Sequence, residues 1–124
     1  MRIKTKDIPA LRDKIAEEQG GMCGLCKVDL KTVVPCLDHD HTSGLIRGVL
    51  CQNCNGIEGK IFNLCRRAKR DGTPFKFLMN IMSYWDAYAS VPRKEMHPTH
   101  KTQEEKKARR NKLARLRRKK LTSK

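Results

Sequence analysis

Residues 37–41 read Leu-Asp-His-Asp-His and concentrate acid and imidazole groups in a chain that is otherwise rich in lysine and arginine. The carboxylates of Asp38 and Asp40 can bind a hard metal ion, and the imidazoles of His39 and His41 can bind metal or move a proton. Four interpretations are open at this point: a polar turn, ligands of a zinc ion, a catalytic metal site, or chance. The choice depends on where the other metal ligands of the chain lie.

Six cysteines supply the second set of side chains that could do chemistry. Cys23 and Cys26 form one Cys-x2-Cys pair, Cys51 and Cys54 form another, and residues 27–50 separate the two pairs. A zinc ion takes four soft ligands in a tetrahedron, and each Cys-x2-Cys turn supplies two of them from one short loop. We therefore predict a structural zinc ion bound by these four thiolates, which leaves no open position to activate water.

Redox chemistry of the thioredoxin type is the rival interpretation of these cysteine pairs. It requires a pair at the start of a helix that follows a strand of a larger sheet, and the chain is too short to build one. Cys65 falls on the apolar face of an expected helix, which predicts a small core residue. Cys36 is close to the acid-histidine cluster and is a further candidate metal ligand, although a buried structural thiol is favoured.

The charge of the chain indicates its class of partner. A formal net charge of +15 on 124 residues favours a polyanion, with DNA or RNA the first candidate and an acidic membrane surface the second. Most of this charge lies in residues 101–124, where lysine and arginine far outnumber glutamate. No apolar signal region is found at the N-terminus and no apolar run approaches membrane-spanning length, so we expect a cytoplasmic protein without membrane partners.

The spacing of apolar and turn-forming residues predicts the elements that must position these side chains. A helix is expected over residues 7–19, where Thr5 or Asp7 can cap its start and Gly20-Gly21 ends it. The later elements are, in order, a zinc knuckle over 22–35, strands over 36–40 and 45–50 joined by a turn, a helix reaching about residue 68, a break at 71–74, a helix over 75–89, and a linker over 91–100.

Because cysteines satisfy the zinc ion, the acid-histidine cluster is available for other chemistry. Asn55 follows the last zinc ligand directly, so the zinc ion would fix it relative to the hairpin that carries Asp38. The Asp38 carboxylate and the Asn55 amide oxygen suit Mg²⁺, which prefers oxygen ligands. A neutral His39 can take a proton from water beside a phosphodiester, which is the chemistry of a metal-assisted hydrolase.

Strand alternation argues against this arrangement in its simplest form. In a regular strand Asp38 lies on one face and His39 on the other, so the two side chains cannot meet at one ion. The chain must therefore bend or bulge at these residues, and neither composition nor spacing shows that bend.

The segment LDHDHTSGLIRGVLCQNCN, with MCGLC upstream, resembles the phage recombination endonuclease VII family, which belongs to the His-Me finger (ββα-metal, HNH-like) nucleases. The resemblance covers about residues 10–65 and implies the irregular chain path that alternation does not provide. It implies that Asp38 and Asn55 are Mg²⁺ or Mn²⁺ ligands and that His39 is the general base. His41 would be a second active-site histidine, and Glu58 would be an acidic residue beside the metal ion, unless it is an ordinary solvated helix glutamate.

The resemblance also implies an organisation for the whole chain. The fold expected is a small α+β, zinc-stapled ββα-metal finger over residues 1–90, with its motif core at 22–65 and a helix on each side. The linker and then a basic tail over 101–124, helical or disordered, would follow it. The side chains expected to contact DNA are those of Arg47, Lys60, Arg109, Arg110, Arg117 and Arg118, with Arg47 alternatively fixing the hairpin.

The function implied is a Mg²⁺-dependent DNA endonuclease that leaves 5′-phosphate and 3′-hydroxyl ends. The family typically acts as a domain-swapped dimer on branched DNA such as Holliday junctions, so a homodimer and a role in phage recombination or packaging, in the host cytoplasm, are expected. Beyond about residue 66 the resemblance ends. Two alternatives stay open: a sequence-tolerant nicking or homing-type HNH endonuclease, and a non-catalytic zinc-containing DNA-binding or host-takeover protein.

Overall fold

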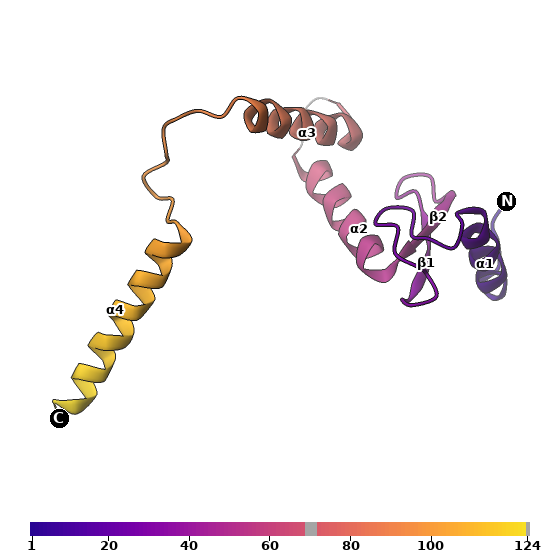
Figure 1. The fold of residues 1–124 in the computed structure, drawn as a ribbon. Helices are drawn as coiled ribbons and strands as arrows, with labels where there is room; N and C mark the ends of the chain where they lie inside the picture. The colour runs from indigo at the N-terminus through magenta and orange to yellow at the C-terminus, as the bar shows by residue number, and fades with distance from the viewer. Residues whose placement is uncertain (69–71, 124) are drawn as a thin grey trace. The chain divides into compact units, whose positions relative to one another are not determined.

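The structure, a computed structural model, describes residues 1–68 and 72–123. The chain forms two compact units, Met1–Met82 and Ser83–Lys124, each of which is treated by itself. The elements in chain order (Figure 1) are a 3-10 turn at Thr5–Asp7, α1 (Ile8–Glu18), β1 (Pro35–His39), β2 (Ile46–Cys51), α2 (Gln52–Arg67), α3 (Pro74–Ser90) and α4 (Gln103–Thr122). The chain is thus a small α+β protein, and Asp71, at the start of the expected break, lies outside the described residues.

Helix α1 has a proline in its first turn and is followed by two glycines. Pro9 lies in its first turn, where a missing backbone N–H costs nothing. Asp7 occupies the N-cap position but its side chain makes no capping hydrogen bond, so the expected cap by Thr5 or Asp7 is absent. At the other end Gly20 and Gly21 have φ of 71° and 74°, a conformation that costs other residues more than glycine.

The first cysteine pair lies in a tight knuckle that is closed by hydrogen bonds within its own backbone. The Cys23 amide donates to the Val28 carbonyl and the Leu30 amide donates to the Gly21 carbonyl, each at 2.9 Å. This knuckle packs on β2, and together they form a core of five buried residues, Cys23, Leu30, Val49, Leu50 and Cys51. Two of the five are cysteines of the predicted zinc site, so the apolar core is small and continuous with that site.

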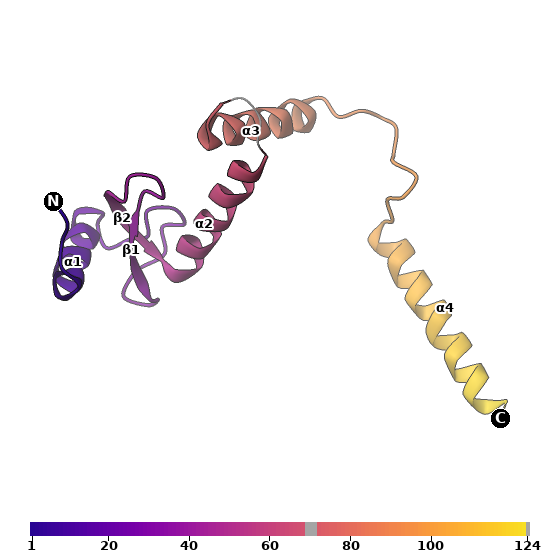
Figure 2. The ribbon, with the colours of Figure 1, turned by 180° about the vertical axis from the view of Figure 1, so that it is seen from behind.

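Strands β1 and β2 form the antiparallel hairpin that the alternation and turn chemistry predict. Leu37 pairs with Val49 and His39 pairs with Ile46, so the register shifts between these two pairs. The ladder therefore contains a bulge in β2, where Arg47 and Gly48 lie opposite Asp38. Strand β1 itself keeps the alternation, because Asp38 is buried and His39 is exposed. Viewed from behind, the hairpin lies between α1 and the first turns of α2 (Figure 2).

The loop of this hairpin answers part of the question that residues 37–41 raise. Asp40 accepts hydrogen bonds through Oδ1 from the amides of Ser43 at 2.7 Å and Thr42 at 2.8 Å, and these bonds lower the pKa of Asp40 below its usual value. Gly44 closes the loop with φ of 77°. Asp40 is therefore a turn residue, as the polar-turn interpretation expects, whereas its neighbours need another explanation.

Gln19 joins the end of α1 to the middle of β2. Its Nε2 donates to the carbonyls of Val49 and Met22, both at 2.9 Å, and its Oε1 accepts from the Val49 amide at 2.8 Å. The side chain thus pairs with Val49 as a neighbouring strand would. A Cβ on Gly48 would lie 2.8 Å from Gln19 Oε1, so a larger residue there would displace the Gln19 side chain from this contact.

The helices after the hairpin expose most of their apolar side chains. In α2, Cys65 is buried as expected, but Ile57 and Leu64 are 46% and 62% exposed. In α3, Trp85 is 66% exposed. Helix α4 begins at Thr102, whose hydroxyl accepts from the Glu105 amide, and none of its residues is buried. The basic tail is therefore helical over 103–122.

We predict that Gln19→Ala lowers the free energy of unfolding by about 1–3 kcal/mol, because the buried amide of Val49 loses its partner and the Val49 carbonyl keeps only the Gly24 amide. Glu18→Ala, at the exposed neighbouring position of α1, is the control and should change stability by less than about 0.5 kcal/mol. Chemical denaturation of the zinc-loaded proteins measures both. Equal stability of the two variants would contradict a supporting role for Gln19.

Candidate functional site

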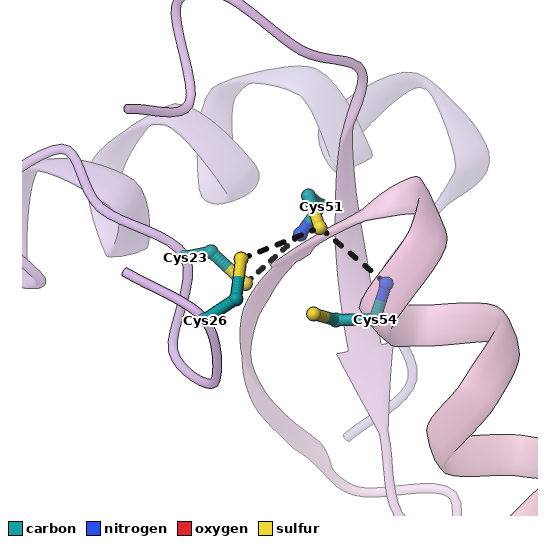
Figure 3. Close-up of side chains that lie close together, drawn as sticks. All are labelled: Cys23, Cys26, Cys51 and Cys54. Carbon is teal, nitrogen blue, oxygen red and sulfur yellow. Dashed lines mark hydrogen bonds between the residues drawn. The ribbon is translucent and has the colours of Figure 1, made fainter. Parts of the chain in front are cut away.

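The four paired cysteines converge on one point. Cys23 and Cys26 come from the knuckle, Cys51 ends β2, and Cys54 lies in the first turn of α2 (Figure 3). Their sulfur atoms all lie within 4.8 Å of one another. This is the set of soft ligands that a tetrahedral zinc ion takes, so the cluster could hold zinc. Among the described residues no other group of three or more His, Cys, Asp or Glu side chains meets the same distance criterion.

The surroundings of the sulfur atoms favour one thiolate but not four. Burial opposes ionisation of Cys23, yet hydrogen bonds from the amides of Cys51 at 3.3 Å and Leu25 at 3.5 Å outweigh it and lower the pKa of Cys23 to about 6. Hydrogen bonding with Cys51, followed by burial, raises the pKa of Cys54 to about 12. Four thiolates this close repel one another, so full deprotonation of the cluster requires a cation at its centre.

The two remaining cysteines are outside this cluster. Cys65 is 7% exposed on α2 and serves as the small core residue that its position predicts. Cys36 in β1 is half-buried rather than buried, which corrects the expectation of a fully buried thiol, and it is not among the clustered ligands.

A second polar constellation lies on the hairpin and α2. Asp38, at the bulge, is 7% exposed and is the one buried charged residue in the part of the chain that the structure describes. Arg47 from β2 donates to it twice, from Nε to Oδ2 at 2.7 Å and from Nη2 to Oδ1 at 3.1 Å. This pairing with Asp38 raises the pKa of Arg47 above its usual value, so its positive charge is permanent. The fork geometry fixes the carboxylate as well as neutralising it.

The same guanidinium extends the constellation to α2 and the hairpin loop. Arg47 Nη2 lies 3.0 Å from Oε1 of Glu58, and Oε2 of Glu58 lies 2.7 Å from Nε2 of His41. Because a carboxylate accepts hydrogen bonds, the imidazole is the donor, which leaves Nδ1 as the acceptor in a neutral ring. We call this set of four side chains the Asp38–Arg47–Glu58–His41 chain.

Helix α2 holds the ring of His41 from a second side. The rings of His41 and Phe62 stack with centroids 4.6 Å apart and planes 20° from parallel. Gly59 lies beside the ring, and a Cβ there would make an ordinary van der Waals contact with His41 Cε1 at 3.6 Å. Sequence reasoning missed Phe62. Its position four residues after Glu58, and hence on the same helix face, was the available signal.

The other side chains predicted for the site lie at its edge or elsewhere. His39 is exposed at the end of β1, and its ring centroid is 6.2 Å from that of His41. Asn55 is half-buried in the first turn of α2, directly after Cys54, and is not part of the Asp38–Arg47–Glu58–His41 chain. Lys60 is exposed on α2, as are the four predicted arginines of α4, Arg109, Arg110, Arg117 and Arg118. DNA contacts by these residues stay a prediction.

Comparison with known proteins identifies the class to which this hairpin, helix and cysteine cluster belong. The chain matches the family described as recombination endonuclease VII over residues 2–87, which is more than half of its length. The chain therefore belongs to the recombination endonuclease VII family, whose members are nucleases. The match extends well beyond residue 66, where the resemblance of the motifs ends.

Two phage proteins show the same relationship over a shorter stretch. The chain is 44% identical over 43 residues to the gene 59 protein of Mycobacterium phage L5 and 45% identical over 42 residues to that of phage D29. These stretches cover 34% and 33% of this chain and 26% of each relative, so the chain spans about a quarter of the length of both. In residues 1–68 and 72–123, no helix is long and apolar enough to cross a membrane.

We predict that the protein isolated from cells contains one zinc ion per chain and that Cys26→Ser loses most of it, together with the fixed tertiary structure of residues 21–54. The physical reason is that the small core cannot hold the knuckle against β2 without the metal. Metal analysis and thermal unfolding measure the two effects. Cys36→Ser, which removes a thiol outside the cluster, is the control, and zinc loss in this variant would contradict the ligand assignment.

Proposed function

We propose that the protein is a Mg²⁺-dependent endonuclease of the His-Me finger type that hydrolyses phosphodiester bonds in DNA, with 5′-phosphate and 3′-hydroxyl products. Membership of the recombination endonuclease VII family supports this proposal. The single observation that carries it is the buried carboxylate of Asp38 at a hairpin bulge, joined through Arg47 and Glu58 to an active-site histidine on a β1–β2–α2 unit.

His39 supplies the proton acceptor in this proposal. It follows Asp38 directly and is exposed, so water and a phosphodiester can reach it. A neutral imidazole can accept a proton from water beside a phosphodiester. The bulge of β2 lies opposite Asp38, next to the point where His39 must approach the same phosphate as its neighbour.

Asp38 and Asn55 are the residues that would hold a divalent ion. The donor types suit a hard cation, because a carboxylate and an amide supply oxygen ligands, and Glu58, which shares Arg47 with Asp38, offers a further carboxylate. Two carboxylates against the one guanidinium of Arg47 also leave the constellation with an excess of negative charge. A bound Mg²⁺ or Mn²⁺ would stabilise the charge that develops on the phosphate and on the departing oxygen.

His41 has a different role from His39 because its ring is held in place. The hydrogen bond to Glu58 and the stack on Phe62 fix its orientation at the rim of the site. A ring that is held by two contacts orients a substrate phosphate at lower entropic cost than a mobile one. We therefore assign to His41 a contact with the phosphate rather than proton abstraction.

The substrate proposed is branched or distorted DNA, such as a Holliday junction, cut by a homodimer during phage recombination or packaging. The family description and the phage relatives support the recombination setting. A sequence-tolerant nicking enzyme is the second candidate. The observation that favours it is α4, an exposed helix of 20 residues in which basic side chains occupy every face and which suits any phosphate backbone.

The central experiment compares cleavage of a four-way junction with cleavage of a linear duplex of the same sequence by the wild type and His39→Ala. We expect the wild type to cut the junction faster and His39→Ala to lose at least about 100-fold in rate, the contribution of a general base, while DNA binding stays within about twofold. His100→Ala, in the exposed segment before α4, is the matched control. Wild-type cutting by His39→Ala would refute the base assignment, and equal rates on both DNAs would favour the nicking enzyme.

The contribution of α4 can be read from the salt dependence of DNA binding. Arg117→Ala/Arg118→Ala should reduce the slope of log affinity against log salt by up to about 2, because each arginine on a phosphate releases about one counterion. Arg117→Lys/Arg118→Lys keeps the charge and should keep the slope. Fluorescence anisotropy at several salt concentrations measures both, and an unchanged slope in the alanine variant would place these arginines away from DNA.

A further inference from the structure

Arg47 is the only residue of the Asp38–Arg47–Glu58–His41 chain that contacts two acids. Its guanidinium reaches from β2 to Asp38 on β1 and to Glu58 on α2, and Glu58 in turn holds His41 in the hairpin loop. The side chain of Arg47 is 38% exposed, whereas those of Asp38 and Glu58 are 9% and 23% exposed. A cation at the mouth of the site thus covers two less exposed carboxylates.

Two carboxylates this close to one another need a positive charge between them. Without a cation, each raises the electrostatic cost of ionising the other, and the burial of Asp38 adds to that cost. Arg47 is permanently charged, and its planar fork offsets part of the negative charge of the two carboxylates and fixes their orientation. A divalent ion bound by Asp38 would supply the same neutralisation at the same place.

We infer that Arg47 is a positioning residue that acts as the resident cation of this site: it holds Asp38 and Glu58 in place in the ion-free protein and releases Oδ1 of Asp38 when a divalent ion binds. This inference rests on the proposed function, because it takes Asp38 as a ligand of the ion. The sequence left two roles open for Arg47, phosphate contact and fixing of the hairpin. The role inferred here differs from both, because it depends on whether the divalent ion is bound.

The distances indicate which contact is released. The Nε–Oδ2 hydrogen bond is 2.7 Å long and the Nη2–Oδ1 hydrogen bond is 3.1 Å long, so Oδ1 is the more weakly held oxygen of Asp38. Nη2 also lies 3.0 Å from Glu58 and keeps that partner when Oδ1 is released. Arg47 therefore stays attached at Oδ2 and at Glu58, and the carboxylate keeps its orientation while one oxygen becomes available.

A competition of this kind has a consequence that an ordinary supporting residue does not have. The free energy of ion binding is the sum of two contributions. The contacts of the ion with its ligands are favourable, and the loss of the hydrogen bond between Arg47 and Asp38 is unfavourable. Removing the arginine removes that cost and leaves two uncompensated carboxylates. The ion-free protein should then become less stable while its affinity for the ion rises, and saturation with the ion should offset most of the lost stability.

The test uses the full-length, zinc-loaded protein freed of other divalent ions, with Mn²⁺ as the probe and electron paramagnetic resonance as the readout of free ion. Arg47→Gln should bind Mn²⁺ at least about fivefold more tightly than the wild type, and should melt at a lower temperature without Mn²⁺. Arg66→Gln, which removes the same charge from an exposed position at the end of α2, is the control for net charge and should match the wild type. Unchanged or weaker Mn²⁺ binding by Arg47→Gln would overturn the inference.

A double-mutant cycle without Mn²⁺ tests the holding role by itself. The fall in melting temperature caused by Arg47→Gln should be less than half as large in an Asp38→Asn background, because the partner of the guanidinium is already lost. Additive effects would overturn the holding role. Arg47→Lys, which keeps the charge but loses the fork, should fold if Arg47→Gln does not, and should melt below the wild type.

The same variants separate the inference from the proposed function. Mn²⁺ binding that is weakened by Asp38→Asn but equal in the wild type and Arg47→Gln would overturn the inference and leave the nuclease proposal intact. Mn²⁺ binding that does not respond to Asp38→Asn would overturn the ligand assignment, and with it both proposals.

Discussion

The structure depends on one convergence, that of four cysteine sulfurs from two segments that are distant in sequence. Cys23 and Cys51 are themselves core residues, so the contact that would bind a zinc ion is also the centre of the small apolar core. The strand β2 and the helix α2 meet at Cys51, and the knuckle is fastened to both. The side chains of the second constellation lie on β1, β2, their loop and α2, which belong to the hairpin and the helix that meet at this point. A metal clamp at that junction therefore sets the geometry of the whole site.

The small size of the core also determines how the charges of the site are paired. A core this small cannot bury an unpaired carboxylate, because the cost of removing the charge from water has no apolar contribution to offset it. Asp38 is buried nonetheless, and Arg47 supplies its partner from the neighbouring strand. The arginine is placed there by the hairpin register, which shifts between Leu37 and His39. The bulge places Arg47 and Gly48 of β2 opposite Asp38, and so brings the compensating cation to the acid.

Sequence reasoning predicted the parts of this arrangement that local patterns encode. Paired cysteines, the turn residues around Gly44 and the helical spacing after Leu50 each act over a few residues, and each element formed where its pattern placed it. The fork between Arg47 and Asp38, the stack of Phe62 on His41 and the Gln19 contact with Val49 depend on register and on helix orientation. Register and helix orientation are set by the packed structure, so no local sequence pattern predicts these contacts. The exposure of Cys36 and of the apolar side chains of α2 is missed for the same reason.

The two constellations differ in the kind of cation that they suit, and this difference separates the structural role of the first from the catalytic role proposed for the second. The cysteine cluster offers only soft sulfur ligands and closes around its ion, so it can hold the fold but cannot present an ion to a substrate. The Asp38 constellation offers oxygen ligands, and Arg47 and the neighbouring His39 are accessible to solvent. The guanidinium of Arg47 offsets part of the negative charge of this constellation and is held there by contacts with the side chains of Asp38 and Glu58. An ion site that must admit both a cation and a phosphate gains from such a partner. The arginine keeps the carboxylates in place while the site is empty, and a bound divalent ion would add the positive charge that favours the approach of DNA.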